Sequence, residues 1–120
     1  MRYKCNPKYR RLDALFKQVI LSERPNRCEW CMQTKPCDLA HLLPKGKYRK
    51  MRYDPTNVIL LCRYCHDKFH SSPVDACTFI AKYKGVDYFD NLRLKDRMIS
   101  RLPDLKILAE YFRKELEALK

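Results

Sequence analysis

The stretch CDLAHLLPKGKYRKMRYDPTNVILLCRYCHDKFH, residues 37–70, contains every histidine of this 120-residue chain. The three histidines are His41, His66 and His70. The stretch also holds Cys62 and Cys65, spaced C-x-x-C, and a second such pair, CEWC at residues 28–31, lies shortly before it. Residue types that bind metals are therefore concentrated in one segment, which indicates a metal-binding core.

The two cysteine pairs predict a structural zinc site. A C-x-x-C turn brings two thiolates to one ion, and two such turns complete a closed tetrahedral site. The predicted ligands are Cys28, Cys31, Cys62 and Cys65. Such a site adds folding free energy that a small core lacks. A single pair can instead be a redox centre, but two pairs without alternating strands and helices favour zinc. Cys37 is close enough in sequence to replace Cys31 as a ligand.

The distance between the two pairs is unusual for a zinc ribbon. Residues 32–61 separate them, whereas a simple ribbon has about 15–20 residues at this point. The additional length contains His41, Asn57 and a basic loop. We therefore expect the zinc to hold the two ends of an inserted functional segment.

Hydrophobic periodicity predicts a small α+β domain. The expected helices and strands are a helix over residues 7–24 capped by Asn6, strands at 38–43 and 58–62, a helix at 62–71, and helices that open at Ser72-Pro73, near Asp87 and at Pro103. The last helix has an apolar stripe that runs as far as Leu119. We expect one domain, with a basic N-terminal helix in residues 1–27, a zinc-stapled core in 28–72 and C-terminal helices in 73–120.

The charge of the chain favours a polyanionic partner. Its 26 Lys and Arg residues exceed its 14 Asp and Glu residues and give a net charge of +12, which is typical of nucleic-acid binding. No apolar run approaches the ~18 residues of a membrane span, and the first residues lack the apolar core of a signal peptide. We expect a cytoplasmic protein without a membrane partner, and a reducing compartment argues against a disulfide framework for its cysteines.

A basic loop lies between the two expected strands. Its cations are Lys45, Lys47, Arg49, Lys50 and Arg52, and no acidic residue interrupts them. Contacts of this kind with phosphates give salt-dependent affinity without sequence preference. No recognition helix is identifiable, so we expect low sequence specificity unless a partner protein directs the chain to its target.

His66 and His70 are four residues apart on an expected helix, so their imidazoles share one face and can reach one ion. They indicate a second metal site. The alternatives are a Cys2His2 zinc site that uses them in place of cysteines, and a pair of surface histidines without a role. His41 lies in an otherwise apolar strand beside the basic loop. Considered alone, His41 is more typical of a buried core histidine whose ring nitrogens are hydrogen-bonded.

The order of these residues resembles the HNH endonucleases, which share the ββα-metal motif. His41 on the first strand, Asn57 in DPTNVILLC and His66 in CRYCH stand at the three signature positions. The paired cysteines are similar to the zinc-containing branch of that family. LAHLLPKGKYRKMRYDPTNVILLCRYCHDKFH is particularly similar to small phage-type HNH proteins, and if the chain is phage-encoded we expect it in the host cytoplasm. The terminal helices lie outside the resemblance.

The resemblance implies metal-dependent hydrolysis of phosphodiester bonds in DNA. His41 would act as the general base, and Asn57 would hold the loop that positions His41. A divalent ion on His66 and His70 would contact the scissile phosphate. The runner-up interpretation is a zinc-stabilised DNA-binding module without catalysis. A protein-interaction zinc finger would need more interleaved metal ligands than this chain supplies.

One position departs from the family pattern. Many members carry Asp or His immediately before the base, where this chain has Ala40, which cannot bind a metal. Asp38 is the nearest carboxylate and is a candidate ligand of the catalytic ion, although a regular strand would point it to the side opposite His41. We expect Mg²⁺ or Mn²⁺ as the catalytic ion, because the site has open positions.

Overall fold

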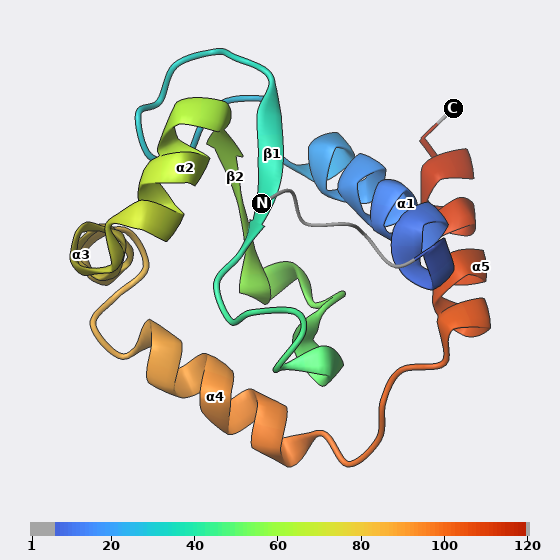
Figure 1. The fold of residues 1–120 in the computed structure, drawn as a ribbon. Helices are drawn as coiled ribbons and strands as arrows, with labels where there is room; N and C mark the ends of the chain where they lie inside the picture. The colour runs from blue at the N-terminus through green and yellow to red at the C-terminus, as the bar shows by residue number, and fades with distance from the viewer. Residues whose placement is uncertain (1–6, 120) are drawn as a thin grey trace. The chain divides into compact units, whose positions relative to one another are not determined.

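The computed structural model describes residues 7–119, which fall into two compact units (Figure 1). One unit combines residues up to Pro25 with those from Pro103 onward, and the other spans Asn26–Leu102. Cys5 and the expected helix cap Asn6 lie outside the described residues.

The first unit is a pair of helices. Helix α1 (Pro7–Glu23) packs against α5 (Leu105–Glu117), and the ring of Phe16 stacks on that of Phe112 at 5.4 Å between centroids. Leu12, Val19 and Ile20 are also buried, as the apolar periodicity of α1 predicts. The stripe expected to reach Leu119 stops short, because α5 ends at Glu117 and Leu119 is 63% exposed.

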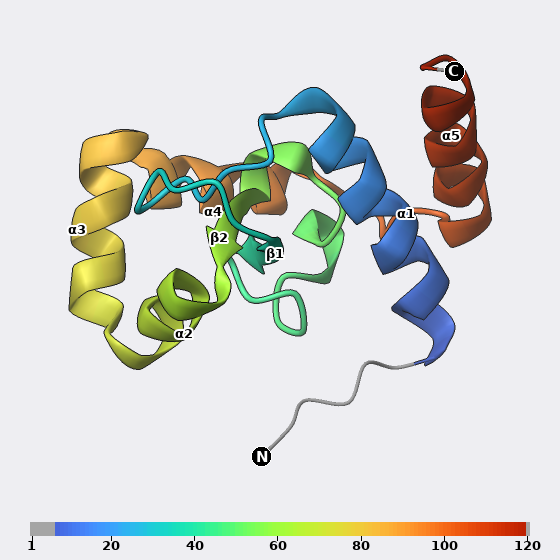
Figure 2. The same ribbon diagram turned by 90° about the horizontal axis from the view of Figure 1, so that it is seen from above.

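The second unit contains a two-stranded antiparallel sheet with a helix packed on it. Strand β1 (Cys37–His41) pairs with β2 (Val58–Cys62), so that Cys37 lies opposite Cys62 and His41 opposite Val58. Helix α2 (Arg63–Ser71) packs on both strands, and α3 (Pro73–Tyr83) lies beside α2 in both views (Figures 1 and 2). Helix α4 (Tyr88–Met98) follows. The fold is α+β with a ββα core, as predicted.

Strand β2 is the centre of this core, and all five of its residues are buried. Its continuous apolar run VILLC reflects cover on both of its faces. The edge of β2 that faces away from β1 is closed by Glu29. Its backbone N–H donates to the carbonyl of Leu60, and its carboxylate accepts from the N–H of Leu60. Tyr83 on α3 donates its hydroxyl to the same carboxylate at 2.6 Å.

The chain between the strands contains two short 3-10 turns, η1 (Arg49–Met51) and η2 (Pro55–Asn57). The first strand was expected to continue to residue 43, but it ends at His41. The side chain of Asn57 hydrogen-bonds to both the backbone N–H and the carbonyl of Leu43, so these groups do not pair with β2. This turn directs the basic loop away from the sheet and places its far end next to His41.

Candidate active site

The four thiols of the two C-x-x-C pairs meet at one point. Their Sγ atoms all lie within 4.8 Å of one another, and the Sγ atoms of Cys31 and Cys62 are 3.9 Å apart. Four zinc–sulfur bonds of ~2.3 Å in a tetrahedron require sulfurs ~3.8 Å apart. Cys28 and Cys31 come from a turn, Cys62 ends β2 and Cys65 lies on α2. The arrangement therefore has the size of a zinc site and joins the start of the unit to its ββα core.

The electrostatics of the thiols also fit a cation. Burial raises the pKa of Cys28, but backbone N–H groups of Cys31, Cys62 and Trp30 more than offset this effect and lower the pKa to about 7. Burial raises the pKa of Cys65 well above its usual range, and hydrogen bonds with the neighbouring thiols raise it further. Thiols this close cannot all ionise without a positive charge between them, so the donor set suits Zn²⁺.

The turn that carries Cys28 and Cys31 is held by its own backbone. The N–H of Met32 donates to the carbonyl of Cys28 at 2.9 Å, and the N–H of Cys28 donates to Gln33 at 3.1 Å. Met32 adopts a left-handed φ of 65°, a conformation with a steric cost for residues other than glycine. Cys37 is not one of the four gathered thiols; it donates to the carbonyl of Lys35 at 3.1 Å, and burial raises its pKa.

His41 is fixed by a backbone carbonyl. Its Nε2 lies 2.8 Å from the carbonyl oxygen of Arg52, at the far end of the basic loop. A carbonyl oxygen can only accept a hydrogen bond, so Nε2 carries the proton and Nδ1 has the lone pair in the neutral ring. The contact therefore selects one tautomer of His41, the one in which Nδ1 can accept a proton.

Asn57 fastens the two ends of that loop. Its side chain is fully buried; Oδ1 accepts from the N–H of Leu43 at 2.8 Å, and Nδ2 donates to the carbonyls of Leu43 at 3.2 Å and Met51 at 3.1 Å. Its own carbonyl accepts from the N–H of Leu42 at 2.8 Å. These bonds join the residues after His41 to the residue before Arg52. They hold the ends of the loop whose last cation, Arg52, contacts His41 through its carbonyl.

The helix histidines are adjacent and one of them is oriented by a carboxylate. The rings of His66 and His70 are 4.8 Å apart between centroids. Asp38 accepts a hydrogen bond from Nδ1 of His66 at 3.0 Å, and Arg63 approaches the same oxygen at 3.5 Å. With Nδ1 bound to the carboxylate, the lone pair of His66 is on Nε2. Carboxylates commonly orient metal-binding histidines in this way.

The position of Asp38 follows from the alternation of the strand. Asp38 and Ala40 point to one face of β1, and the Asp38 contact shows that α2 lies on that face. His41 is the last residue of the strand and contacts the end of the basic loop. Ala40 is buried there with only 1% of its surface exposed. Within residues 7–119, the four cysteines are the only group of three or more metal-binding side chains whose ligand atoms converge. The structure brings Asp38 to His66, and His66 beside His70, but does not gather all three around one point.

The protonation of His70 suits a metal ligand. Burial lowers its pKa below the usual range, and the neighbouring His66 lowers it further. The imidazole is therefore neutral at neutral pH, the form that binds metals.

The cations of the basic loop differ in exposure. Lys47 and Arg49 are exposed, and Lys45 and Lys50 are half-buried. Lys50 donates to the carbonyl of Ile99, after α4, at 2.8 Å. Arg52 is only 6% exposed, with its guanidinium 5.8 Å from the ring of Tyr53. The carbonyl of Arg52 contacts His41, and the phosphate contact expected of its guanidinium stays a prediction.

Sequence reasoning missed the contribution of α4 to this loop. Asp54 accepts from the N–H of Thr56 at 2.9 Å and pairs with Lys95 at 2.7 Å. Tyr88 donates its hydroxyl to the carbonyl of Thr56. The dipeptide Asp54-Pro55 is a recognisable start of a helical turn, but nothing in the sequence indicates that Lys95 and Tyr88 would reach it.

Comparison with known families agrees with this geometry. Residues 28–72 match the family described as HNH endonuclease. The chain matches no curated protein and no solved structure. No helix in the described part of the chain is long and apolar enough to cross a membrane. The matched segment contains the cysteine cluster, His41, Asn57 and the helix histidines, so the match covers the same residues as the resemblance to the HNH endonucleases.

Proposed function

We propose that this protein is a metal-dependent HNH endonuclease that hydrolyses phosphodiester bonds of DNA with little sequence preference. His41 acts as the general base, and His66 and His70 hold the catalytic ion. The observation that supports this proposal best is the contact between Nε2 of His41 and the carbonyl of Arg52. It leaves Nδ1 as the proton acceptor, and a core histidine that only satisfies its own hydrogen bonds would not need the brace formed by Asn57.

The reaction would begin with a water molecule that loses a proton to Nδ1 of His41 as its oxygen attacks phosphorus. His66 and His70 would hold a Mg²⁺ or Mn²⁺ ion, whose chemistry when bound is to neutralise charge on the phosphate and on the leaving 3′ oxygen. Asp38 accepts a hydrogen bond from Nδ1 of His66 and would thereby leave Nε2 of His66 available to hold the ion. A single active site would nick one strand; two cuts need two sites.

The DNA backbone would lie against the basic loop. Lys47 and Arg49 are exposed and would contact phosphates together with Lys45. Lys50 and Arg52 would act mainly on the shape of the loop, since the first is bonded to Ile99 and the second is buried. Affinity would accordingly fall as salt rises.

The test is nicking of supercoiled plasmid by the zinc-loaded wild type and by His41→Ala, with Mg²⁺ and Mn²⁺ supplied separately. We expect metal-dependent nicking by the wild type and a loss of about 100- to 10,000-fold in the variant, the usual contribution of a general base. Both proteins must contain one equivalent of zinc, so that unfolding is excluded as the cause.

Rescue supplies the control. Added imidazole should restore part of the activity of His41→Gly if the lost group is a base, but not if the histidine only supports the fold. A zinc-loaded wild type that binds DNA without nicking it would contradict the proposal. In that case Ala40 marks a site without chemistry, and the chain is a DNA-binding module.

A further inference from the structure

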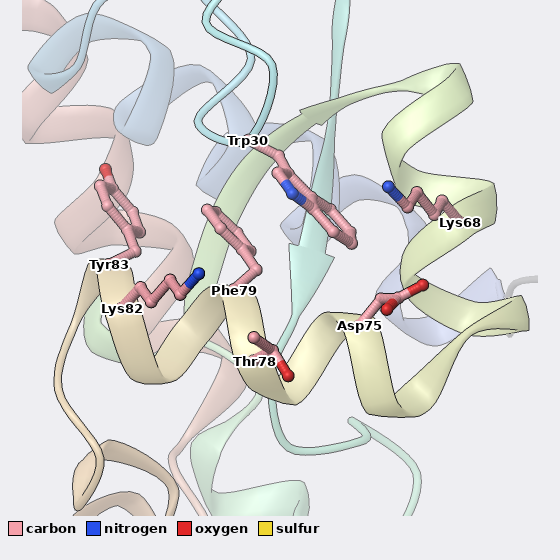
Figure 3. Close-up of a pocket in the computed structure, with 7 residues that line it drawn as sticks. All are labelled: Trp30, Lys68, Asp75, Thr78, Phe79, Lys82 and Tyr83. Atoms are coloured by element: carbon pink, nitrogen blue, oxygen red, sulfur yellow. The ribbon is translucent and has the colours of Figure 1, made fainter.

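A groove of about 440 Å³ lies on the side of the second unit formed by α3 and the cysteine turn (Figure 3). Figure 3 shows Trp30, Phe79 and Tyr83 in a row, with Lys68 reaching in from α2 and Lys82 from α3. Its volume falls within the ~300–1,000 Å³ of small-molecule sites. No part of the proposed cleavage machinery lines this groove.

The aromatic row is a continuous stack. The rings of Trp30 and Phe79 are 4.7 Å apart and tilted by only 5°, and those of Phe79 and Tyr83 are 5.3 Å apart at 10°. Tyr83 is 43% exposed, although the apolar stripe of α3 predicts a core position for it. Stacked parallel rings at a surface offer flat apolar area that a further planar ring can extend.

Three lysines border the stack, and the carboxylate of Glu29 accepts from the hydroxyl of Tyr83 at one end of it. The ammonium of Lys68 lies over the ring of Trp30 at 4.7 Å, and that of Lys84 lies over Tyr83 at 4.8 Å. Lys82 lines the groove, and Asp75 is the one acidic side chain among its lining residues. Flat rings bordered by lysines match the two parts of a nucleotide, since the base stacks and the phosphate is anionic.

We propose that this groove binds an unpaired nucleotide of single-stranded DNA, with its base on Trp30 and its flanking phosphates at Lys68 and Lys82. Lys68 would move from the ring face to a phosphate. The proposal rests on DNA being the substrate. On α2, Lys68 is two residues from both His66 and His70, so it points to the opposite side of the helix. A strand held in the groove would therefore lie behind the helix that carries the proposed metal pair.

Trp30 is the single tryptophan of the chain, so its fluorescence reports on this groove alone. The zinc-loaded His41→Ala protein, without added Mg²⁺ or Mn²⁺, is titrated with a short oligothymidylate and with an abasic oligonucleotide of the same length. We expect saturable quenching by the first. Its affinity should exceed that of the abasic strand about 5- to 150-fold, the contribution of one stacked base.

Matched charge reversals locate the site. Lys82→Glu should weaken the base-dependent quenching, whereas Lys106→Glu on α5 should leave it unchanged. Equal affinity for both oligonucleotides would overturn the proposal, as would equal quenching by polyglutamate, which would indicate an acidic protein partner. Thymidine monophosphate that binds as tightly as the oligonucleotide would also overturn it, in favour of a free nucleotide.

The two proposals fail separately. The titration uses a protein that does not cleave, so wild-type nicking without base-dependent quenching contradicts only the groove. Quenching as expected, together with a wild type that does not nick, contradicts only the catalytic proposal.

Discussion

Asn57 is the residue whose replacement should separate the basic loop from His41, the proposed base, most directly. Its fully buried side chain bonds to three backbone groups, two on Leu43 and one on Met51. In Asn57→Ala the two backbone groups of Leu43 lose this partner, and the carbonyl of Met51 keeps only the bond from the N–H of Asp54, at 3.3 Å. Each bond lost to a buried group costs about 1 kcal/mol or more. We expect a loss of about 2–4 kcal/mol in the free energy of unfolding, measured by urea denaturation of the zinc-loaded protein.

The same variant should also lose nicking activity, since the carbonyl that holds His41 follows Met51. Asn91→Ala on the exposed side of α4 is the matched control and should change neither property. A stable Asn57→Ala protein with full activity would show that the loop does not depend on this amide.

Single residues also show what the sequence alone could predict. His41, Asn57 and His66 stand out in the sequence as candidate site residues, because their order and spacing form a motif. The hydrogen bond between Asp38 and His66 could not be predicted, because it depends on where α2 packs against β1. Arg52 was grouped with the other loop cations by charge, but its burial follows from the path of the loop, which no local pattern encodes.

At the scale of elements, α4 braces the loop through the pair between Lys95 and Asp54. Burial raises the pKa of Asp54, but hydrogen bonds from Lys95 and Thr56 outweigh it and hold the pKa below its usual range. A carboxyl whose folded pKa is depressed stabilises the fold above its unfolded pKa, near ~4, and loses that effect as the pH falls through the folded value.

Asp54→Asn should therefore be less stable than the wild type at pH 7, by about 1 kcal/mol or less because Lys95 stays half exposed. The difference between the two proteins should be constant from about pH 8 to 5 and shrink below about pH 4. Acid releases zinc from both proteins alike, so the difference in unfolding free energy is the quantity to measure. A difference that vanishes already near pH 6 would contradict the depressed pKa of Asp54.

The helices and strands were largely predictable because each is an apolar pattern with a clear start. Pro7 and Pro73 stand at helix starts as expected, whereas the last helix begins at Leu105, two residues after the expected Pro103, with Asp104 as its cap. The end of β1 was not predictable, because the bonds of Leu43 to Asn57 compete with the ladder. The positions of Phe79 and Tyr83 are compatible with a buried apolar stripe and with a stack of rings at the surface. Periodicity shows which face of a helix is apolar, but not what covers that face.

At the scale of the molecule, the cysteine cluster should decide whether the second unit folds. A structural zinc contributes about 10–16 kcal/mol, comparable to the ~5–15 kcal/mol stability of a whole domain. Cys62→Ser should therefore lose zinc, the secondary structure of residues 26–102 and nicking together, as followed by chromogenic zinc release and circular dichroism. Cys77→Ser is the matched control, because Cys77 is exposed and outside the cluster.

The division of the chain into two compact units could not be predicted from the sequence. The partner of α1 is α5, at the other end of the chain, and both helices have ordinary amphipathic patterns that are compatible with many partners. The cysteine spacing, by contrast, constrains distant parts of the chain directly, which is why the core of residues 28–72 was the most predictable part.

Glu29, between the two cysteines of the first pair, has a consequence for self-association. An open strand edge is a template on which another copy of a chain can add a strand, and proteins protect such edges against aggregation. Glu29 occupies both backbone groups of Leu60, the middle residue of β2, so an incoming strand would find no donor or acceptor at that residue. The turn that gathers the thiols thereby also protects the middle of this apolar strand against pairing with another copy of the chain.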